Sequence, residues 1–176
     1  SEPYGRHGGD LQGIIDNLDY IEELGVTAIW NTPVFESNDI QSSYHMYAGT
    51  DVYKIDRRFG SNKKYRELSY QLKKRGMKLI MDYVLNHWGL NHYMVVDSPT
   101  KDWINSWDSY TNASHNKEIF SDPYASKIDL KETTQGWFTE SMPDLNQNQP
   151  QFLKYLKQNA ISVSYTHLRA HETMEY

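Results

Sequence analysis

The sequence predicts an α/β protein whose strands form a parallel sheet. Residues 10–30 and 61–84 have the same order of features, namely an amphipathic helix, a glycine and a short apolar strand. Successive helix–strand units of this kind are typical of parallel sheets with right-handed crossovers. The second strand runs directly into polar residues, and in such sheets ligands bind where the strands end. We therefore expect a ligand site at the carboxyl end of this strand.

The first unit begins after a polar, glycine-rich loop at residues 1–9. Asp10 is placed to cap a helix, and apolar residues then recur at three- and four-residue spacing, as on one face of an amphipathic helix. This apolar face consists of Leu11, Ile14, Ile15, Leu18, Ile21 and Leu24. Gly25 follows where helices often end, and residues 26–30 are short, apolar and β-branched, like a strand of a parallel sheet.

The second unit follows a long connection at residues 33–60, which we expect to be functional because structureless loops of that length are uncommon in compact domains. Ser61 is placed to cap the helix, and Gly76 ends it. The buried face of this helix is predicted to be Tyr65, Leu68 and Leu72. Residues 77–84 then form the second strand, and we expect the strand to be buried on both faces.

The rest of the chain does not repeat this order of helix, glycine and strand. Residues 88–147 have no clear period and are predicted to be a large irregular insertion after the second strand. Gln149 and Pro150 suit the start of a third helix. The apolar face of that helix is predicted to be Phe152, Leu153, Leu156 and Ala160. Residues 162–176 resemble a translated sequencing adapter, so we expect a non-native tail and exclude it from the fold prediction.

Motif content and composition exclude several architectures and functions. A doubly wound sheet and a (β/α)8 barrel fit the elements equally well, but no Gly-x-Gly-x-x-Gly motif supports dinucleotide binding. The formal net charge of −5 argues against a nucleic-acid partner, and no apolar run approaches the ~20 residues of a membrane span. The absence of cysteine excludes disulfides and thiolate metal sites. The aromatic content of 14% fits a carbohydrate ligand, but aromatic residues that fill cores and loops explain it as well.

Three polar residues at the end of the second strand are the strongest candidates for chemistry. Asp82 and His87 can hydrogen-bond a polar substrate there, and Asn86 can hold a loop or an ion. The structural alternative is an aspartate that caps the next loop and a histidine with no ligand. Asp82 is the one carboxylate at a predicted strand end, and glycoside hydrolysis needs two, so these residues alone indicate a polar-ligand site without a reaction.

Two further stretches could join this site. Tyr47 could stack on a sugar ring and His45 could donate to a hydroxyl, although an aromatic cluster that holds the long loop in place explains both residues as well. Asp144 and Asn146 precede the third helix and could return to the same place, or they could simply form a turn before that helix. The spacing leaves these alternatives open.

Several motifs resemble, in order and spacing, those of the α-amylase family of glycoside hydrolases. Residues 82–87, Asp-Tyr-Val-Leu-Asn-His, are similar to the first conserved region of that family, and residues 44–60 are similar to its His-Gly-Tyr loop and the segment after it. Blocks similar to the first barrel helix, the second strand and the end of domain B are residues 9–14, 25–34 and 142–146. The resemblance covers residues 4–161, and the Met-Pro, Leu-Asn and Gly-Trp-Phe motifs are most similar to neopullulanases and cyclomaltodextrinases.

The resemblance implies a fold and a division into domains. The fold would be a partial (β/α)8 TIM barrel, roughly from helix 1 to helix 3, with domain B inserted after strand 3. The expected division is residues 1–87 for the first part of the barrel, 88–147 for domain B, 148–161 for barrel helix 3 and 162–176 for the non-native tail. Since two strands cannot close a barrel, we expect uncovered apolar faces and an isolated chain that is poorly soluble or molten.

The resemblance also implies roles for the candidate residues. The expected substrate-binding residues are Tyr47, His45, Asp82 and His87. Tyr47 would stack on the glucose beside the scissile bond, and the other three would bind the hydroxyls of that sugar. One residue departs from the family pattern, because Met46 takes the place of the usual glycine before Tyr47. We expect Met46 to crowd the loop or to shift the tyrosine ring.

Calcium is the one cofactor that the resemblance implies. Asn86 and Asp144 match calcium ligands of many α-amylases, although the neopullulanase-like branch often lacks that site. Catalytic residues are expected to be absent from this chain. In the family, the nucleophile, the acid/base and the third carboxylate lie on strands four, five and seven.

The implied activity is retaining hydrolysis of α-1,4 or α-1,6 glucosidic bonds in starch, pullulan, maltodextrins or cyclodextrins. The chain would be an inactive fragment of an enzyme that binds α-glucans, with no nucleic-acid or membrane partner. The whole enzyme is expected to be a homodimer in the bacterial periplasm or cytoplasm. The alternatives are an oligo-1,6-glucosidase or trehalose synthase, or the non-catalytic barrel of an amino-acid transporter heavy chain. A heavy chain has no physical need to retain Tyr47, Asp82 and His87 together.

Overall fold

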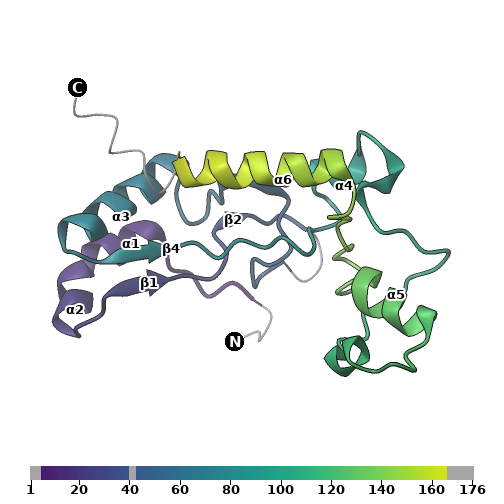
Figure 1. Cartoon of the computed structure of the whole chain (residues 1–176). Coiled ribbons are helices and arrows are strands. Elements are labelled where there is room, and N and C mark those ends of the chain that lie inside the picture. The colour runs from purple at the N-terminus through teal and green to yellow at the C-terminus, as the bar shows by residue number, and fades with distance from the viewer. Residues whose placement is uncertain (1–4, 40–42, 166–176) are drawn as a thin grey trace.

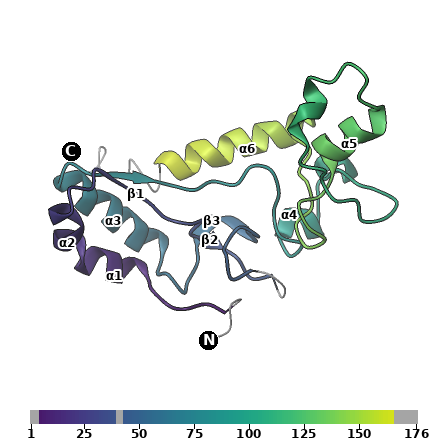
Figure 2. The ribbon, with the colours of Figure 1, turned by 90° about the horizontal axis from the view of Figure 1, so that it is seen from below.

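The computed structural model describes residues 5–39 and 43–165, which form two regions joined by a long helix. One region holds a small parallel sheet with three helices, and the other is the irregular stretch of residues 81–149 (Figure 1). Helix α6, Pro150–Val163, runs from the irregular region back to the helical layer (Figure 2). In the described residues, no helix has the length and apolar character needed to cross a membrane.

The helical layer forms largely where the apolar periodicity predicts it. Its members are α1 (Leu11–Asp16), α2 (Leu18–Glu23) and α3 (Asn62–Lys74). Asp10 and Ser61 cap α1 and α3 as predicted, each accepting a hydrogen bond from a backbone N–H three residues on. The single helix predicted for residues 11–24 is wrong, because it breaks at Asn17, whose side chain donates to the carbonyl of Gly13 at 2.7 Å.

The sheet pairs β1, Ala28–Trp30, in parallel with β4, Lys78–Ile80. Ile29 and Leu79 pair with each other and pack against the buried core beside the helices. Trp30 and Ile80 also pair, on the opposite face, and are 69% and 45% exposed. The prediction that the second strand is buried on both faces is therefore wrong, because described residues cover only one face of this sheet. The expected uncovered apolar face is present.

A hairpin occupies the connection that was predicted as a long loop. Strands β2, Phe35–Glu36, and β3, Asp51–Ile55, pair antiparallel, with a register shift between Phe35 and Glu36. No strand pattern predicts β2, because it has two residues and follows Pro33. We use the word turn for residues 43–50, the last part of the connection between β2 and β3. This turn includes Tyr47, so the pairing of β2 with β3 positions that residue.

Residues 88–147 contain short helices and isolated bridges. The helices are α4 (Tyr93–Val96), η1 (Lys101–Trp103), η2 (Lys117–Phe120) and α5 (Lys127–Gln135). The stretch returns to its starting point, because His87 pairs antiparallel with Asp144, and Leu145 N donates to the carbonyl of Asn86 at 2.9 Å. The end of β4 and the segment before α6 therefore lie side by side. The domain limits themselves stay a prediction.

Two buried clusters stabilise these regions, and α6 contacts both. Phe152 and Leu156 of α6 pack with Trp88 and Trp103, and Val163 packs with the helical layer. The helix extends beyond the predicted end at residue 161. Its predicted apolar face is partly wrong: Leu153 is 36% exposed, whereas Asn159 is buried, where Tyr83 donates to its side-chain oxygen.

Candidate functional site

The candidate site lies where the turn of the β2–β3 hairpin meets the chain after β4. Tyr47 comes from the turn, and Asp82 follows β4 by two residues. Residues 81–86 have no strand partner among the described residues, since the pairing of β1 with β4 ends at Trp30 and Ile80.

Tyr47 and Asp82 are in direct contact. The Tyr47 hydroxyl donates to Oδ2 of Asp82 at 3.1 Å, and the Tyr47 side chain is 36% exposed. Burial raises the pKa of Tyr47 above its ordinary value, and the hydrogen bond to Asp82 and the charge of that carboxylate raise it further. The phenol is therefore protonated at neutral pH, and its hydroxyl donates to the Asp82 carboxylate.

His45 is held next to Tyr47 by the backbone. Its Nδ1 accepts a hydrogen bond from the N–H of Tyr47 at 2.9 Å, which assigns the proton of the neutral ring to Nε2. The two rings lie with centroids 5.9 Å apart. Burial lowers the pKa of His45, and the positive charge of Arg6 lowers it further, so the ring is neutral at pH 7 with Nε2–H as a donor.

His87 is buried beside the same turn. Its ring stacks on Phe138, with centroids 4.7 Å apart and an angle of 12° between planes. The pKa of His87 is lowered to about 4; burial is the main cause, the Tyr47 backbone acts in the opposite direction, and the charge of His45 adds to the lowering. Nε2 of His87 makes no regular hydrogen bond among the described residues. The structure thus brings the four predicted sugar-binding residues to one place.

The two predicted calcium ligands lie on adjoining backbone segments. Asp144 is buried, and its Oδ2 accepts a hydrogen bond from the side-chain amide of Asn105 at 2.7 Å. Burial raises the pKa of Asp144 to about 6, and the Asn105 hydrogen bond acts in the opposite direction. The side chain of Asn86 is exposed and its amide nitrogen lies 3.3 Å from Nδ1 of His87.

This donor set fits calcium only in part. Carboxylate and amide oxygens are ligands that Ca²⁺ prefers, but Ca²⁺ takes about six to eight of them. Across residues 5–39 and 43–165, no group of three His, Cys, Asp or Glu side chains could hold a metal ion. Asp144 supplies the single carboxylate of the predicted pair.

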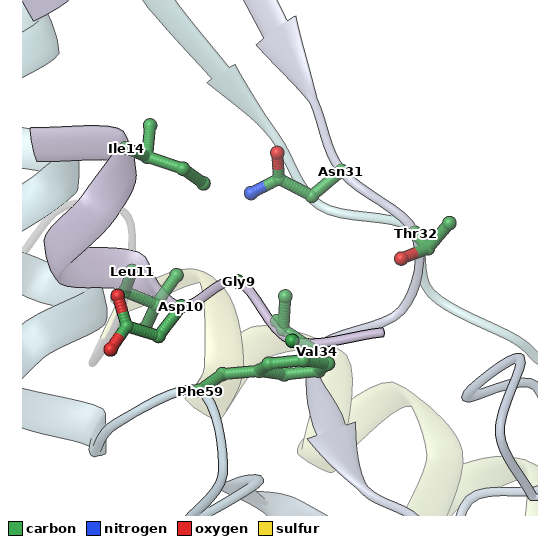
Figure 3. Close-up of a pocket in the computed structure, with 9 residues that line it drawn as sticks. Gly9, Asp10, Leu11, Ile14, Asn31, Thr32, Val34 and Phe59 are labelled. Carbon is green, nitrogen blue, oxygen red and sulfur yellow. The ribbon is translucent and has the colours of Figure 1, made fainter. Parts of the chain in front are cut away.

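Several contacts around this site were not predicted from the sequence. His87 stacks on Phe138, and Asp144 accepts from Asn105. The turn that carries Tyr47 is bound by Arg6. All three partners are distant in the chain from the residues they contact. A separate cavity of about 250 Å³ lies between the start of α1 and the chain after β1 (Figure 3). It is lined by none of the predicted site residues.

Comparison with known proteins gives the family. Residues 2–167 match the alpha amylase catalytic domain. A cyclomaltodextrinase from Thermoanaerobacter pseudethanolicus is 37% identical over 158 residues, which cover 85% of this chain and 24% of that protein. An intracellular maltogenic amylase from Bacillus subtilis is 36% identical over 156 residues, which cover 85% of this chain and 23% of that protein. The chain thus spans about a quarter of the length of the curated relatives it matches.

A solved structure supports the same assignment. The α-amylase from Geobacillus thermoleovorans, in complex with acarbose, superposes with a TM-score of 0.74 and 34% identity, over 95% of this chain and 34% of that one. The parallel pair β1–β4 with its helices is therefore part of a (β/α)8 barrel, which confirms the predicted fold class. The chain belongs to the alpha-amylase family, within the catalytic domain.

Proposed function

We propose that this chain forms the sugar-binding side of the active site of an α-glucan hydrolase. The observation that carries the proposal is the 3.1 Å hydrogen bond between Tyr47 and Asp82 at the carboxyl end of β4. It joins a half-exposed aromatic ring to a carboxylate, and this pair matches the apolar and polar faces of a glucose ring. The relatives include a cyclomaltodextrinase and a maltogenic amylase, which supports an α-glucan as the ligand.

Each side chain has a distinct part in holding the sugar. The Tyr47 ring would pack against the C–H groups of glucose, and Asp82 would accept hydrogen bonds from hydroxyls. His45 would donate from Nε2, whose proton is assigned by the hydrogen bond at Nδ1. His87 is neutral at pH 7 because burial lowers its pKa to about 4, so it would bind a hydroxyl without adding charge.

The reaction of the whole protein is proposed as retaining hydrolysis of α-1,4 or α-1,6 glucosidic bonds. Retaining hydrolysis needs a carboxylate nucleophile and a carboxylic acid about 5 Å apart. Among the described residues, Asp82 is the one acidic side chain bonded to the Tyr47 turn at this site. We therefore assign binding, and no catalytic role, to the residues of this chain.

Acarbose binding tests the proposal. Isothermal titration of the 176-residue chain with acarbose should show binding that Tyr47→Ala weakens by about tenfold or more, which is 1.4 kcal/mol or above. Tyr20→Ala is the matched control, since Tyr20 is 62% exposed on α2 in the helical layer. Equal affinity of the Tyr47 and Tyr20 variants would contradict the assignment.

Calcium binding by Asn86 and Asp144 stays a prediction. A buried carboxylate whose pKa is raised to about 6 is a group that a cation would stabilise, which supports the prediction. The small number of ligand side chains among the described residues argues against calcium binding. A thermal melt with calcium or with a chelator decides the matter: binding requires a higher midpoint with calcium, lost in Asp144→Asn.

A further inference from the structure

Met46, the residue before Tyr47, has a backbone conformation that is rare for its type. Its φ is 72°, in the left-handed region that favours glycine, and its side chain is 3% exposed. Because Met46 directly precedes Tyr47, its backbone conformation affects the direction in which the Tyr47 side chain leaves the chain. Because an unconstrained methionine avoids this region, surrounding contacts must hold it there.

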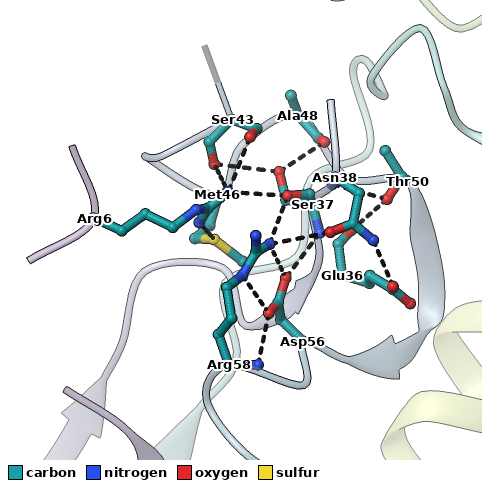
Figure 4. Close-up of polar contacts among 10 residues, drawn as sticks. All are labelled: Arg6, Glu36, Ser37, Asn38, Ser43, Met46, Ala48, Thr50, Asp56 and Arg58. Atoms are coloured by element: carbon teal, nitrogen blue, oxygen red, sulfur yellow. Dashed lines mark hydrogen bonds and ion pairs between the residues drawn. The ribbon is translucent and has the colours of Figure 1, made fainter. Parts of the chain in front are cut away.

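Arg6 supplies those contacts from the N-terminal segment (Figure 4). Its Nη1 donates to Sδ of Met46 at 2.7 Å. Its Nη2 donates to the carbonyls of Ser37 at 3.0 Å and Ser43 at 2.9 Å, and to the Ser43 hydroxyl at 2.9 Å. One guanidinium thus joins the residue after β2, the start of the turn and the methionine side chain.

The buried carboxylate of Asp56 lies beside Ser37, whose carbonyl accepts from Arg6. Asp56 is fully buried and forms an ion pair with Arg58, whose Nη2 also donates to the Ser37 carbonyl at 2.8 Å. Burial lowers the pKa of Arg6 and the charge of Arg58 lowers it further, whereas the charge of Asp56 acts in the opposite direction. Ser37 N–H donates to the Asp56 carboxylate at 3.2 Å, so Asp56 orders the residue whose carbonyl accepts from both guanidinium groups.

We propose that Arg6 is a positioning residue for Tyr47: by binding the Met46 sulfur and the carbonyls of Ser37 and Ser43, it holds Met46 in the left-handed conformation that brings the Tyr47 hydroxyl to Asp82. The expected effect on sugar affinity rests on the proposed function. The expected effect on the Tyr47–Asp82 contact does not, and the two are measured separately.

The test uses Arg6→Ala, Met46→Gly and the double variant in the 176-residue chain. Arg6→Ala should weaken acarbose binding about tenfold and move the phenol pKa of Tyr47, followed by ultraviolet titration against Tyr47→Phe, back towards about 10. Met46→Gly is the reference for the double variant, because it also removes a buried side chain. The double variant should bind acarbose within about twofold of Met46→Gly, because glycine adopts a positive φ without an anchor.

Rescue by glycine separates positioning from general stability. If Arg6 only stabilised the fold, Met46→Gly would not restore either readout, and a double variant as defective as Arg6→Ala would overturn the proposal. Unchanged readouts in Arg6→Ala would overturn it as well. Arg57→Ala is the matched control, since it removes an exposed guanidinium next to Asp56.

Two further outcomes are distinguishable. If the unmodified chain binds no acarbose, the proposed function fails, and the Tyr47 pKa still decides the role of Arg6. If circular dichroism shows that Arg6→Ala is unfolded, Arg6→Lys replaces it. Lysine keeps the charge and lacks the fork that spans Met46, Ser37 and Ser43, so the same loss and the same rescue by glycine are expected.

Discussion

Tyr47 and Asp82 are 35 positions apart in the chain, and one hydrogen bond of 3.1 Å joins the hydroxyl of the first to the carboxylate of the second. The contact forms although Met46 takes the place of the family glycine. The structure therefore accommodates the methionine by burying its side chain, and the phenol still reaches Asp82. Whether the ring is displaced relative to the family stays a prediction.

Asp82→Asn should lower the phenol pKa of Tyr47 without returning it fully to about 10. The substitution removes the negative charge that disfavours the phenolate, whereas burial, the largest cause of the raised pKa, remains. Absorbance titration at alkaline pH, with Tyr47→Phe subtracted, measures the shift. An unchanged pKa would mean that the carboxylate and the phenol are apart in solution.

The 176-residue chain should not hydrolyse starch, pullulan or cyclodextrin. One carboxylate cannot serve as both nucleophile and acid/base, and Asp82 is the acidic residue bonded to Tyr47 at this site. Reducing-sugar assays with purified chain measure the activity, with Asp82→Asn as the control for contaminating enzymes. Turnover that disappears in Asp82→Asn would prove this prediction wrong.

The stability of the fold should fall as the pH decreases below about 6.5, in part through His92. Burial lowers the pKa of His92 to about 3, so the unfolded chain takes up this proton first on acidification and the folded state loses stability. His87 acts in the same direction, and Asp144, with its pKa raised to about 6, acts in the opposite direction.

The contribution of His92 can be isolated with His92→Asn. Asparagine can still cap α4 by accepting from Met94 N–H, as His92 Nδ1 does at 3.1 Å, but it does not titrate. Between pH 6 and 4 the variant should lose about 1.4 kcal/mol less stability per pH unit, as measured by urea unfolding. The measured quantity is the change in the free energy of unfolding per pH unit, because losing the ring stack on Trp88 lowers stability at every pH. Equal slopes would exclude a buried neutral His92.

Gly89→Ala should destabilise the protein by about 1–3 kcal/mol. A Cβ at this position would lie 1.9 Å from Oδ2 of Asp39 and 2.8 Å from the carbonyl oxygen of Ala48, so backbone must move. Gly13→Ala is the matched control, since its Cβ would meet its nearest atom at 3.4 Å and alanine favours the helix α1. Chemical denaturation should show a loss for Gly89→Ala and none for Gly13→Ala.

The chain should self-associate through the uncovered face of the β1–β4 sheet. Trp30 and Ile80 are paired there and largely exposed, and exposed apolar strands promote association. Sedimentation velocity should show association that Trp30→Thr with Ile80→Thr reduces. Val96→Thr is the control, because Val96 is 71% exposed on α4, away from the sheet. Equal association of both variants would place the contact elsewhere.

Local sequence alone determined where α1, α3 and α6 begin and where α2 and α3 end. Asp10, Ser61 and Gln149 cap their helices as predicted, and Gly25 and Gly76 have the positive φ expected after a helix. These features depend on hydrogen bonds and backbone preferences within about four residues, so a short window of sequence contains them. The buried face of α3 followed from its period for the same reason.

Only the tertiary structure decided which surfaces are covered and which distant side chains meet. The apolar period predicted Leu24 and Leu153 as buried, but they are 61% and 36% exposed, whereas Asn159 is buried. The β2–β3 hairpin and the Arg6 contact with Met46 join positions far apart in the chain. Such contacts depend on how complete elements pack, and no local pattern in the sequence encodes them.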